Sequence, residues 1–328
     1  MRTVGTVPLG RQSHVRLLGI MLKFCAIQCT IMLASTGTVS FWYYPPAYGG
    51  EDINATIDLL KSHKGVTANV MLGCGHEVSA QGGITGPSQT SLALCTRTIS
   101  GLRSISVTPE LVLGGSSIDH LRAFFNSGAA NIDSLVNMGK QLGIKGWNLD
   151  LEPITSLPSD ANKYATFLSS AKPKLNMAGM RLTIATATWS SMLSNTALLA
   201  PVVDRVLNME TYNADSMDGW LRGDSVGGYY EKFVAPPTNR SELGPGLGCW
   251  PAKCGPKNAS HGCWSTKQES GPPRMARIVA DGLPEVAMFR IIQVPNRPDL
   301  QWPEDWWWPL LAKFSDSAFT SARESSHA

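Results

Sequence analysis

Short apolar runs alternate along this chain with longer segments in which apolar residues recur at helical spacing. The first run, 38–44 (TVSFWYY), is rich in β-branched and aromatic residues and stops at two prolines, which is typical of a strand. Seven further strands are predicted at 66–72, 109–115, 148–152, 181–189, within 202–213, at 243–250 and at 285–292.

Helices are predicted between these strands. They run from Asp52 or Asn54 to His63, and over 88–102, 118–142 with a break near Gly128, 161–175, 217–233, 273–281 and 302–314, with a polar loop at 79–87. A chain of 328 residues could hold two average domains, but α/β barrels of this size are common. Strand followed by helix, eight times over, predicts an α/β fold, a single-domain (β/α)8 TIM barrel over 37–316.

The predicted strand at 148–152 carries the chain's most informative polar pattern. Because side chains alternate along a strand, Asn148, Asp150 and Glu152 share one face, and the two carboxylates lie about 7 Å apart. Close carboxylates raise each other's proton affinity, which suits one of them to act as a general acid. The alternative is an edge strand whose acidic face lies in water. Glu152 ends this strand, where TIM barrels place catalytic groups.

The segment 145–152 (KGWNLDLE) resembles the signature D-G-x-D-x-D-x-E of glycoside hydrolase family 18, the chitinase family. Gly146, Asp150 and Glu152 match it, whereas Lys145 and Asn148 replace its first two aspartates. The resemblance implies that Glu152 protonates the glycosidic oxygen and that the substrate's own acetamido oxygen is the nucleophile. It implies that Asp150 orients this acetamido group and stabilises the positive charge of the oxazolinium intermediate. This chemistry needs no metal and no cofactor.

The segment 208–213 (NMETYN) resembles the M-x-Y-D segment of the same family. Aligned in this way, Tyr212 is the third predicted catalytic residue, because the family's tyrosine hydrogen-bonds the acetamido carbonyl. Glu210 then replaces the methionine and Asn213 the aspartate. We expect both, together with Asn148, to contact substrate and to alter the pH profile or specificity.

Aromatic residues supply the remaining predicted substrate contacts. Trp42 and Tyr44 share one face of the first strand, and we expect this pair to face the pocket. At the last predicted strand, the segment 288–293 (MFRIIQ) lacks the tryptophan on which the family's reactive sugar usually lies. Trp189, Trp250 or one of the C-terminal tryptophans could replace it. The alternative for each aromatic residue is packing in the core.

Charge and motifs exclude several classes of function. The formal net charge is +3 with both signs scattered and no basic run, so we expect no nucleic-acid partner. The chain has no HExxH, P-loop, G-x-S-x-G or dinucleotide-binding motif. We expect a monomer whose partner is an oligo- or polysaccharide containing N-acetylglucosamine.

The N-terminal 36 residues combine three arginines, an apolar stretch over 17–34 and small residues at 34–37, which is typical of a secretory signal peptide. An uncleaved signal anchor, the only membrane association we expect, or a buried first strand is the alternative. Three glycosylation sequons agree with secretion, at Asn54, Asn239 and Asn258. The final residues, 317–328, are predicted to be a flexible tail.

Five cysteines follow the predicted signal, an odd number that leaves one thiol unpaired. The trio Cys249, Cys254 and Cys263 suits a disulfide-stapled loop, and Cys74 with Cys95 could form a second bridge. A zinc site at the trio is disfavoured, because the tight Cys-x-x-Cys spacing is missing.

Three functional hypotheses follow. The first is a secreted retaining glycosidase that hydrolyses β-1,4-linked N-acetylglucosamine, in chitin oligomers or related glycans, by substrate-assisted catalysis. The second is a non-catalytic chitinase-like lectin. The third is a barrel glycosidase that uses two separate carboxylates, with Glu210 opposite Glu152.

Overall fold

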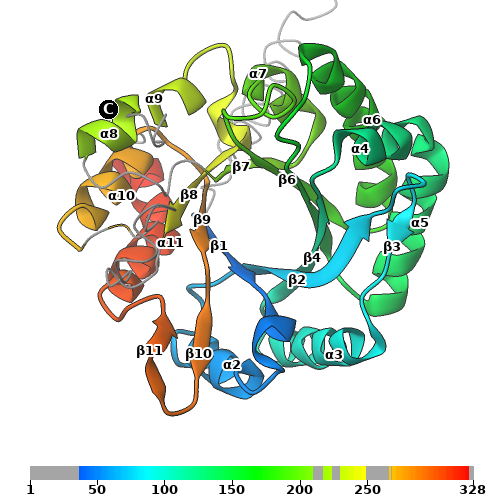
Figure 1. Cartoon of the computed structure of the whole chain (residues 1–328). Helices are drawn as coiled ribbons and strands as arrows, with labels where there is room; N and C mark the ends of the chain where they lie inside the picture. The colour runs from blue at the N-terminus through cyan, green and yellow to red at the C-terminus, as the bar shows by residue number, and fades with distance from the viewer. Residues whose placement is uncertain (1–36, 210–216, 224–229, 249–265, 267, 325–328) are drawn as a thin grey trace, which may run out of the picture. The chain divides into compact units, whose positions relative to one another are not determined.

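The computed structural model describes residues 37–209, 217–223, 230–248, 266 and 268–324. Within these ranges, eight parallel strands form the closed barrel that is seen end-on in Figure 1. In sheet order they are β1 (Thr38–Tyr43), β2 (Asn69–Val78), β4 (Thr108–Gly115), β5 (Gly146–Leu151), β6 (Arg181–Thr186), β7 (Arg205–Asn208), β8 (Leu243–Gly248) and β9 (Glu285–Phe289). β1 pairs with both β2 and β9, which closes the sheet and confirms the predicted TIM barrel.

Helices surround the barrel. The longer ones are α2 (Ile53–Ser62), α3 (Gln89–Ser104), α4 (Ile118–Asn126), α5 (Gly128–Leu142), α6 (Pro158–Met177), α10 (Gly271–Ala280) and α11 (Trp307–Glu324), and the short ones are α7 (Thr196–Leu199), α8 (Met217–Arg222) and α9 (Tyr230–Phe233). The predicted break at Gly128 is confirmed, because α4 ends at Asn126 and α5 begins at Gly128. None of the described helices has the length and apolar character needed to cross a membrane.

Local sequence signals explain several helix ends. Ser88 caps α3, since its hydroxyl oxygen accepts a hydrogen bond from the Ser91 amide at 3.2 Å. Gly143 follows α5 with φ of 69°, a left-handed conformation that glycine adopts without strain.

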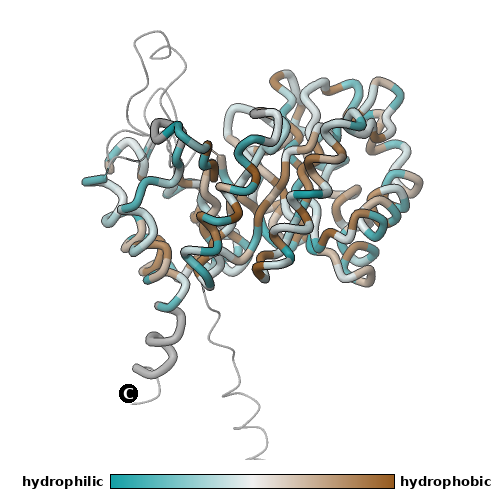
Figure 2. Tube along the Cα trace, turned by 90° about the horizontal axis from the view of Figure 1, so that it is seen from below, coloured by the Kyte–Doolittle hydropathy of each residue, from teal (hydrophilic) through white to brown (hydrophobic). Residues whose placement is uncertain are grey.

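Two apolar layers hold the barrel together. Outward-facing strand residues such as Leu149 and Leu151 are fully buried beneath the helices, and this layer is the main core. A second cluster fills the lumen and consists of Trp42, Met71, Val112, Leu207 and Ala287. Figure 2 shows the apolar residues concentrated along the barrel strands and the polar residues toward the outer helices. The lumen is therefore a packed core below the site and not a pore.

The lumen ends in a buried ionic cluster at the N-terminal ends of the strands. Arg181 lies 3.1 Å from Glu110 and 2.7 Å from Glu285, and Arg205 lies 2.9 Å from Glu285. The hydroxyl of Ser40 also donates to Glu285, at 2.6 Å. Burial raises the pKa of Glu110 to about 7, against the lowering influence of Arg181, whereas the two arginines hold the pKa of Glu285 below its usual value despite burial.

The structure differs from the sequence prediction at β2. We predicted that this strand ends at Leu72, but it continues to Val78 through an irregularity between Leu72 and His76. The extension pairs with a short antiparallel strand, β3 (Ile84–Thr85), inside the segment predicted to be a loop. Gly73 and Gly75 suggest a strand end in sequence, but here they belong to a bulge.

A second difference follows β9. The predicted last strand extended to Ile292, whereas β9 ends at Phe289, and a hairpin of β10 (Ile292–Val294) and β11 (Arg297–Trp302) precedes α11. Pro295 and Asn296 form its turn, and the φ of 60° at Asn296 is one that asparagine tolerates.

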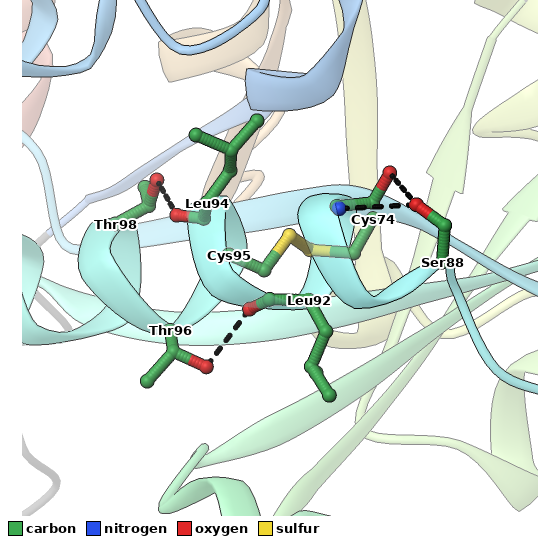
Figure 3. Close-up of a disulfide and its surroundings, with 8 residues drawn as sticks. Cys74, Ser88, Leu92, Leu94, Cys95, Thr96 and Thr98 are labelled. Atoms are coloured by element: carbon green, nitrogen blue, oxygen red, sulfur yellow. Dashed lines mark hydrogen bonds between the residues drawn. A yellow bond between two sulfur atoms is a disulfide. The ribbon is translucent and has the colours of Figure 1, made fainter.

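A disulfide between Cys74 and Cys95 ties β2 to α3, as the sequence suggested. Both cysteines are buried, and Figure 3 shows the bridge running from the strand to the helix. The other cysteine trio, 249, 254 and 263, lies outside the described residues.

Candidate active site

β5 arranges its polar residues as its alternation predicts. Asp150 and Glu152 line a cavity of about 980 Å³ at the C-terminal ends of the strands. Asn148 lies on the same face one step deeper and is fully buried. The intervening leucines face the helices. The three polar residues therefore form a column that rises from the barrel interior into the cavity.

The two carboxyls of the cavity interact with each other directly through a side-chain hydrogen bond. Burial, the charge of Glu152 and this hydrogen bond raise the pKa of Asp150 well above its usual value. Burial also raises the pKa of Glu152, while the hydrogen bond from Asp150 opposes that rise. The pair therefore retains a shared proton above the usual titration range of carboxyls.

Asn148 spans the barrel interior beneath this pair. Its Oδ1 accepts a hydrogen bond from the indole N–H of Trp42 at 3.2 Å, and its Nδ2 donates to the Thr183 hydroxyl at 2.8 Å. The amide thus links β5 to β1 and β6. It contributes no charge below the carboxyl pair.

Tyr44 follows β1 and lies beside the carboxyl pair. Burial, then the charges of Asp150 and Glu152, raise the pKa of its phenol, so it stays protonated at all ordinary pH values. Its ring lies against the backbone of Gly73, where a Cβ would come within 2.1 Å of the ring. Glycine at position 73 therefore makes room for this tyrosine.

Phe289 is a site residue that the sequence pattern did not predict. It ends β9, and its ring makes edge contacts with Trp42 and Tyr44 at centroid distances of 6.1 and 6.2 Å. The sequence signal that points to it is its position in the segment 288–293, which lacks the expected tryptophan. The three rings form an aromatic group next to the cavity's carboxyl pair.

The cavity has polar residues on one side and two exposed apolar residues on the other. The β2–β3 side contributes Glu77 and Thr85, and the loop after β4 with the start of α4 contributes Ser116, Ser117 and His120. On the opposite side, Ile154 and Trp189 are 80% and 45% exposed, respectively. Trp189 therefore lies in the wall of the cavity, with much of its ring open to solvent.

Three predicted site residues, Glu210, Tyr212 and Asn213, lie outside the described residues. The residue before them, Met209, packs against the apolar cluster in the lumen. Among the residues that are described, no group of three or more His, Cys, Asp or Glu could hold a metal ion. The cavity contains a carboxyl pair that shares a proton, an arrangement suited to acid–base catalysis.

No protein-family model and no curated protein matches this sequence. Solved structures do match. A chitinase from Chromobacterium violaceum is 14% identical, with a TM-score of 0.63 over 85% of this chain and 98% of that one. The chain has a chitinase-like barrel fold.

Two other solved structures share this fold. Catalytic domain 2 of the Ostrinia furnacalis group II chitinase, crystallised with penta-N-acetylchitooctaose, is 13% identical with a TM-score of 0.60, over 78% of this chain and 90% of that one. The spore cortex-lytic enzyme SleL of Bacillus megaterium is 14% identical with a TM-score of 0.60, over 84% of this chain and 73% of that one.

Proposed function

We propose that this protein is a secreted retaining glycosidase that hydrolyses β-1,4-linked N-acetylglucosamine in chitin oligomers or related glycans. The observation that carries the proposal is the pair Asp150 and Glu152, which lines a cavity at the C-terminal ends of the barrel strands and retains a proton. The chitinases that share this fold support the choice of substrate class, and one of them was crystallised with a chitooligosaccharide.

The reaction begins with the transfer of the shared proton. Asp150 passes its proton to Glu152, and Glu152 protonates the glycosidic oxygen as the bond to the anomeric carbon breaks. The acetamido oxygen of the same sugar attacks that carbon, which gives an oxazolinium ion and a free alcohol. Asp150, now ionised, stabilises the positive charge, and Glu152 takes a proton from the incoming water. Two inversions at the anomeric carbon leave its configuration retained.

Secretion is part of the proposal. The predicted signal at 1–36 lies outside the described residues, and the support comes from the disulfide between Cys74 and Cys95. Such bridges persist in oxidising compartments. Comparing the mass of the protein in the culture medium with that of the intracellular protein tests both secretion and cleavage.

The direct test of activity is incubation with a chromogenic chitobioside over a broad pH range, with the anomer of the first product followed by NMR. We expect release of the chromophore and a β-configured product. An α-configured first product would contradict the substrate-assisted route and favour a water that attacks opposite the acid.

The rival proposal is a chitinase-like lectin. Asn148 favours it, because the buried amide is bonded to Trp42 and Thr183 and offers Asp150 no second acidic partner. Binding of chitooligosaccharides without any release of chromophore, at any pH where the protein is folded, would support the lectin and overturn the enzyme.

A further inference from the structure

Glu77 brings a third carboxylate into the cavity. In the strand registers, Glu77 of β2 is the partner of Gly114 of β4, and Gly114 is the partner of Asp150 of β5. Partners on neighbouring strands point to the same face, so Glu77 and Asp150 face the cavity from one row. Two strand spacings separate them, roughly 10 Å between their Cα atoms.

A bulge in β2 puts Glu77 in this row. Between the pairs Leu72–Leu111 and His76–Leu113, β2 advances by four residues while β4 advances by two. Uninterrupted pairing would have placed Gly75 opposite Gly114. The inserted residues include Cys74, whose disulfide to Cys95 holds the bulge against α3.

The position of Glu77 beyond the bulge is also fixed. Its backbone pairs with Thr85 of β3, and the Thr85 hydroxyl donates to the Glu77 carbonyl oxygen at 3.0 Å. The side chain is exposed and lines the cavity. In the part of the chain that the structure describes, Glu77 forms no ion pair. The backbone of Glu77 is therefore fixed, and its carboxylate remains open to a ligand.

Gly114 leaves a notch between the two acidic residues. A Cβ at this position would come no closer than 3.8 Å to the backbone of His76 and 3.9 Å to the Glu77 side chain, so an alanine would fit. Glycine is thus not required by packing against these neighbours. The missing side chain keeps the space between Glu77 and Asp150 free for a substituent of the substrate.

The geometry points to Glu77 as a specificity-determining residue that binds the amino group of a glucosamine unit next to the sugar being cleaved, so the favoured substrate is a partly deacetylated chitin. This inference rests on the proposed function. The sugar at the carboxyl pair must keep its acetyl group, because that group provides the nucleophile. A carboxylate only accepts hydrogen bonds, and an ammonium group adds charge attraction that an acetamido group lacks.

The test compares two substrates and five proteins. The proteins are wild type, Glu77→Gln, Glu77→Lys, Gly114→Ala and the control Asp58→Asn. The substrates are fully acetylated chitopentaose and chitosan of mixed acetylation, and the products are sequenced by mass spectrometry. Asp58 is exposed on α2 and outside the cavity, so its substitution changes the net charge as Glu77→Gln does.

In the wild type we expect glucosamine to be enriched at one fixed position beside the cleaved bond. Glu77→Gln should reduce this enrichment about threefold, in line with a solvent-exposed charge pair, and the wild-type enrichment should weaken with added salt. Glu77→Lys should reverse the enrichment of glucosamine, and Gly114→Ala should reduce this enrichment by filling the notch. Both Glu77 variants should still cleave chitopentaose, and the control Asp58→Asn should act on both substrates as the wild type does.

The outcomes separate the two proposals. An unchanged product pattern in Glu77→Gln and Glu77→Lys, with chitopentaose still cleaved, would overturn the role of Glu77 alone. No cleavage of either substrate by the wild type would overturn the proposed glycosidase and this inference together.

Discussion

The two ends of the barrel lumen each hold two acidic residues, and they differ in what surrounds them. At the N-terminal ends of the strands, Glu110 and Glu285 lie between two arginines, with Arg181 in contact with both. At the C-terminal ends, Asp150 and Glu152 interact with each other, and among the described residues no cation forms an ion pair with them.

The difference separates an acidic pair that holds strands together from one that can do chemistry. Arginine fixes the charge and geometry of Glu285, whose pKa is lowered despite complete burial. Without a cation, the pair at the other end keeps a mobile proton next to an open cavity. Paired carboxylates alone therefore do not identify an active site, since their counter-charges and the open space beside them must be known too.

The largest expected effect comes from the carboxyl pair at the C-terminal ends of the strands. Glu152→Gln removes the proposed acid while keeping its size, so kcat on a chromogenic chitobioside should fall about a thousandfold, the range for a lost general acid. Chitooligosaccharide binding, measured by calorimetry, should stay within a few fold. Glu51→Gln, an exposed acid on the loop after β1, is the control. Substantial remaining hydrolysis would remove Glu152 from this role.

Substitutions in the ionic cluster at the N-terminal ends of the strands should change the free energy of unfolding. The pKa of Glu110 is about 7 in the folded protein against 4.5 for an unperturbed glutamate, so the folded state binds the extra proton. This contribution to the free energy of unfolding is present below pH 4.5 and is lost as the pH rises to about 7. Relative to wild type, Glu110→Gln should gain up to about 3 kcal/mol between pH 5 and 8.

Urea unfolding at several pH values measures this gain, and the same Glu51→Gln protein should show none. A constant difference between Glu110→Gln and wild type across the pH range would mean that Glu110 is ionised throughout, like its neighbour Glu285.

Asp150→Asn tests whether Asp150 and Glu152 titrate as one unit. The amide removes the like charge that helps keep a proton on the pair, so the alkaline limb of kcat/KM should move to lower pH by about one unit, in addition to the loss in kcat. Asp204→Asn, at the opposite end of the barrel, should leave the limb in place. An alkaline limb at the same pH in Asp150→Asn would show that Glu152 titrates independently.

The smallest effect is expected from the cavity wall. Trp189→Ala should raise KM for chitooligosaccharides about threefold with little change in kcat, because a half-exposed ring offers stacking area but no chemistry. Met177→Ala, which removes a highly exposed side chain at the end of α6, is the matched control. An unchanged KM in Trp189→Ala would leave the ring without a substrate contact.

Local patterns were sufficient to predict the barrel strands and the face of β5. The alternation of Asn148, Leu149 and Asp150 settles which side chains enter the lumen, and the glycine break between α4 and α5 was equally local. The sequence also suggested that Cys74 and Cys95, the two cysteines outside the trio, could pair, and this bridge is present.

Features that depend on distant partners were not predictable in this way. The extension of β2 beyond Leu72 is supported by β3 and by the disulfide, neither of which is visible at Gly73 or Gly75. The ionic cluster joins residues up to 245 positions apart, such as Ser40 and Glu285. Phe289 became a site residue only when β9 was found to end there.

The closure of the barrel has a consequence for how the protein is made. β1 pairs with β9, so the first barrel strand to be synthesised must wait for the last barrel strand before the barrel can close. Fragments that stop before Glu285 contain Asn148, Asp150 and Glu152. They lack Phe289, the ring that Trp42 and Tyr44 contact. The complete site should therefore form in a single late step of synthesis, and a chain that stops before Glu285 should not form it.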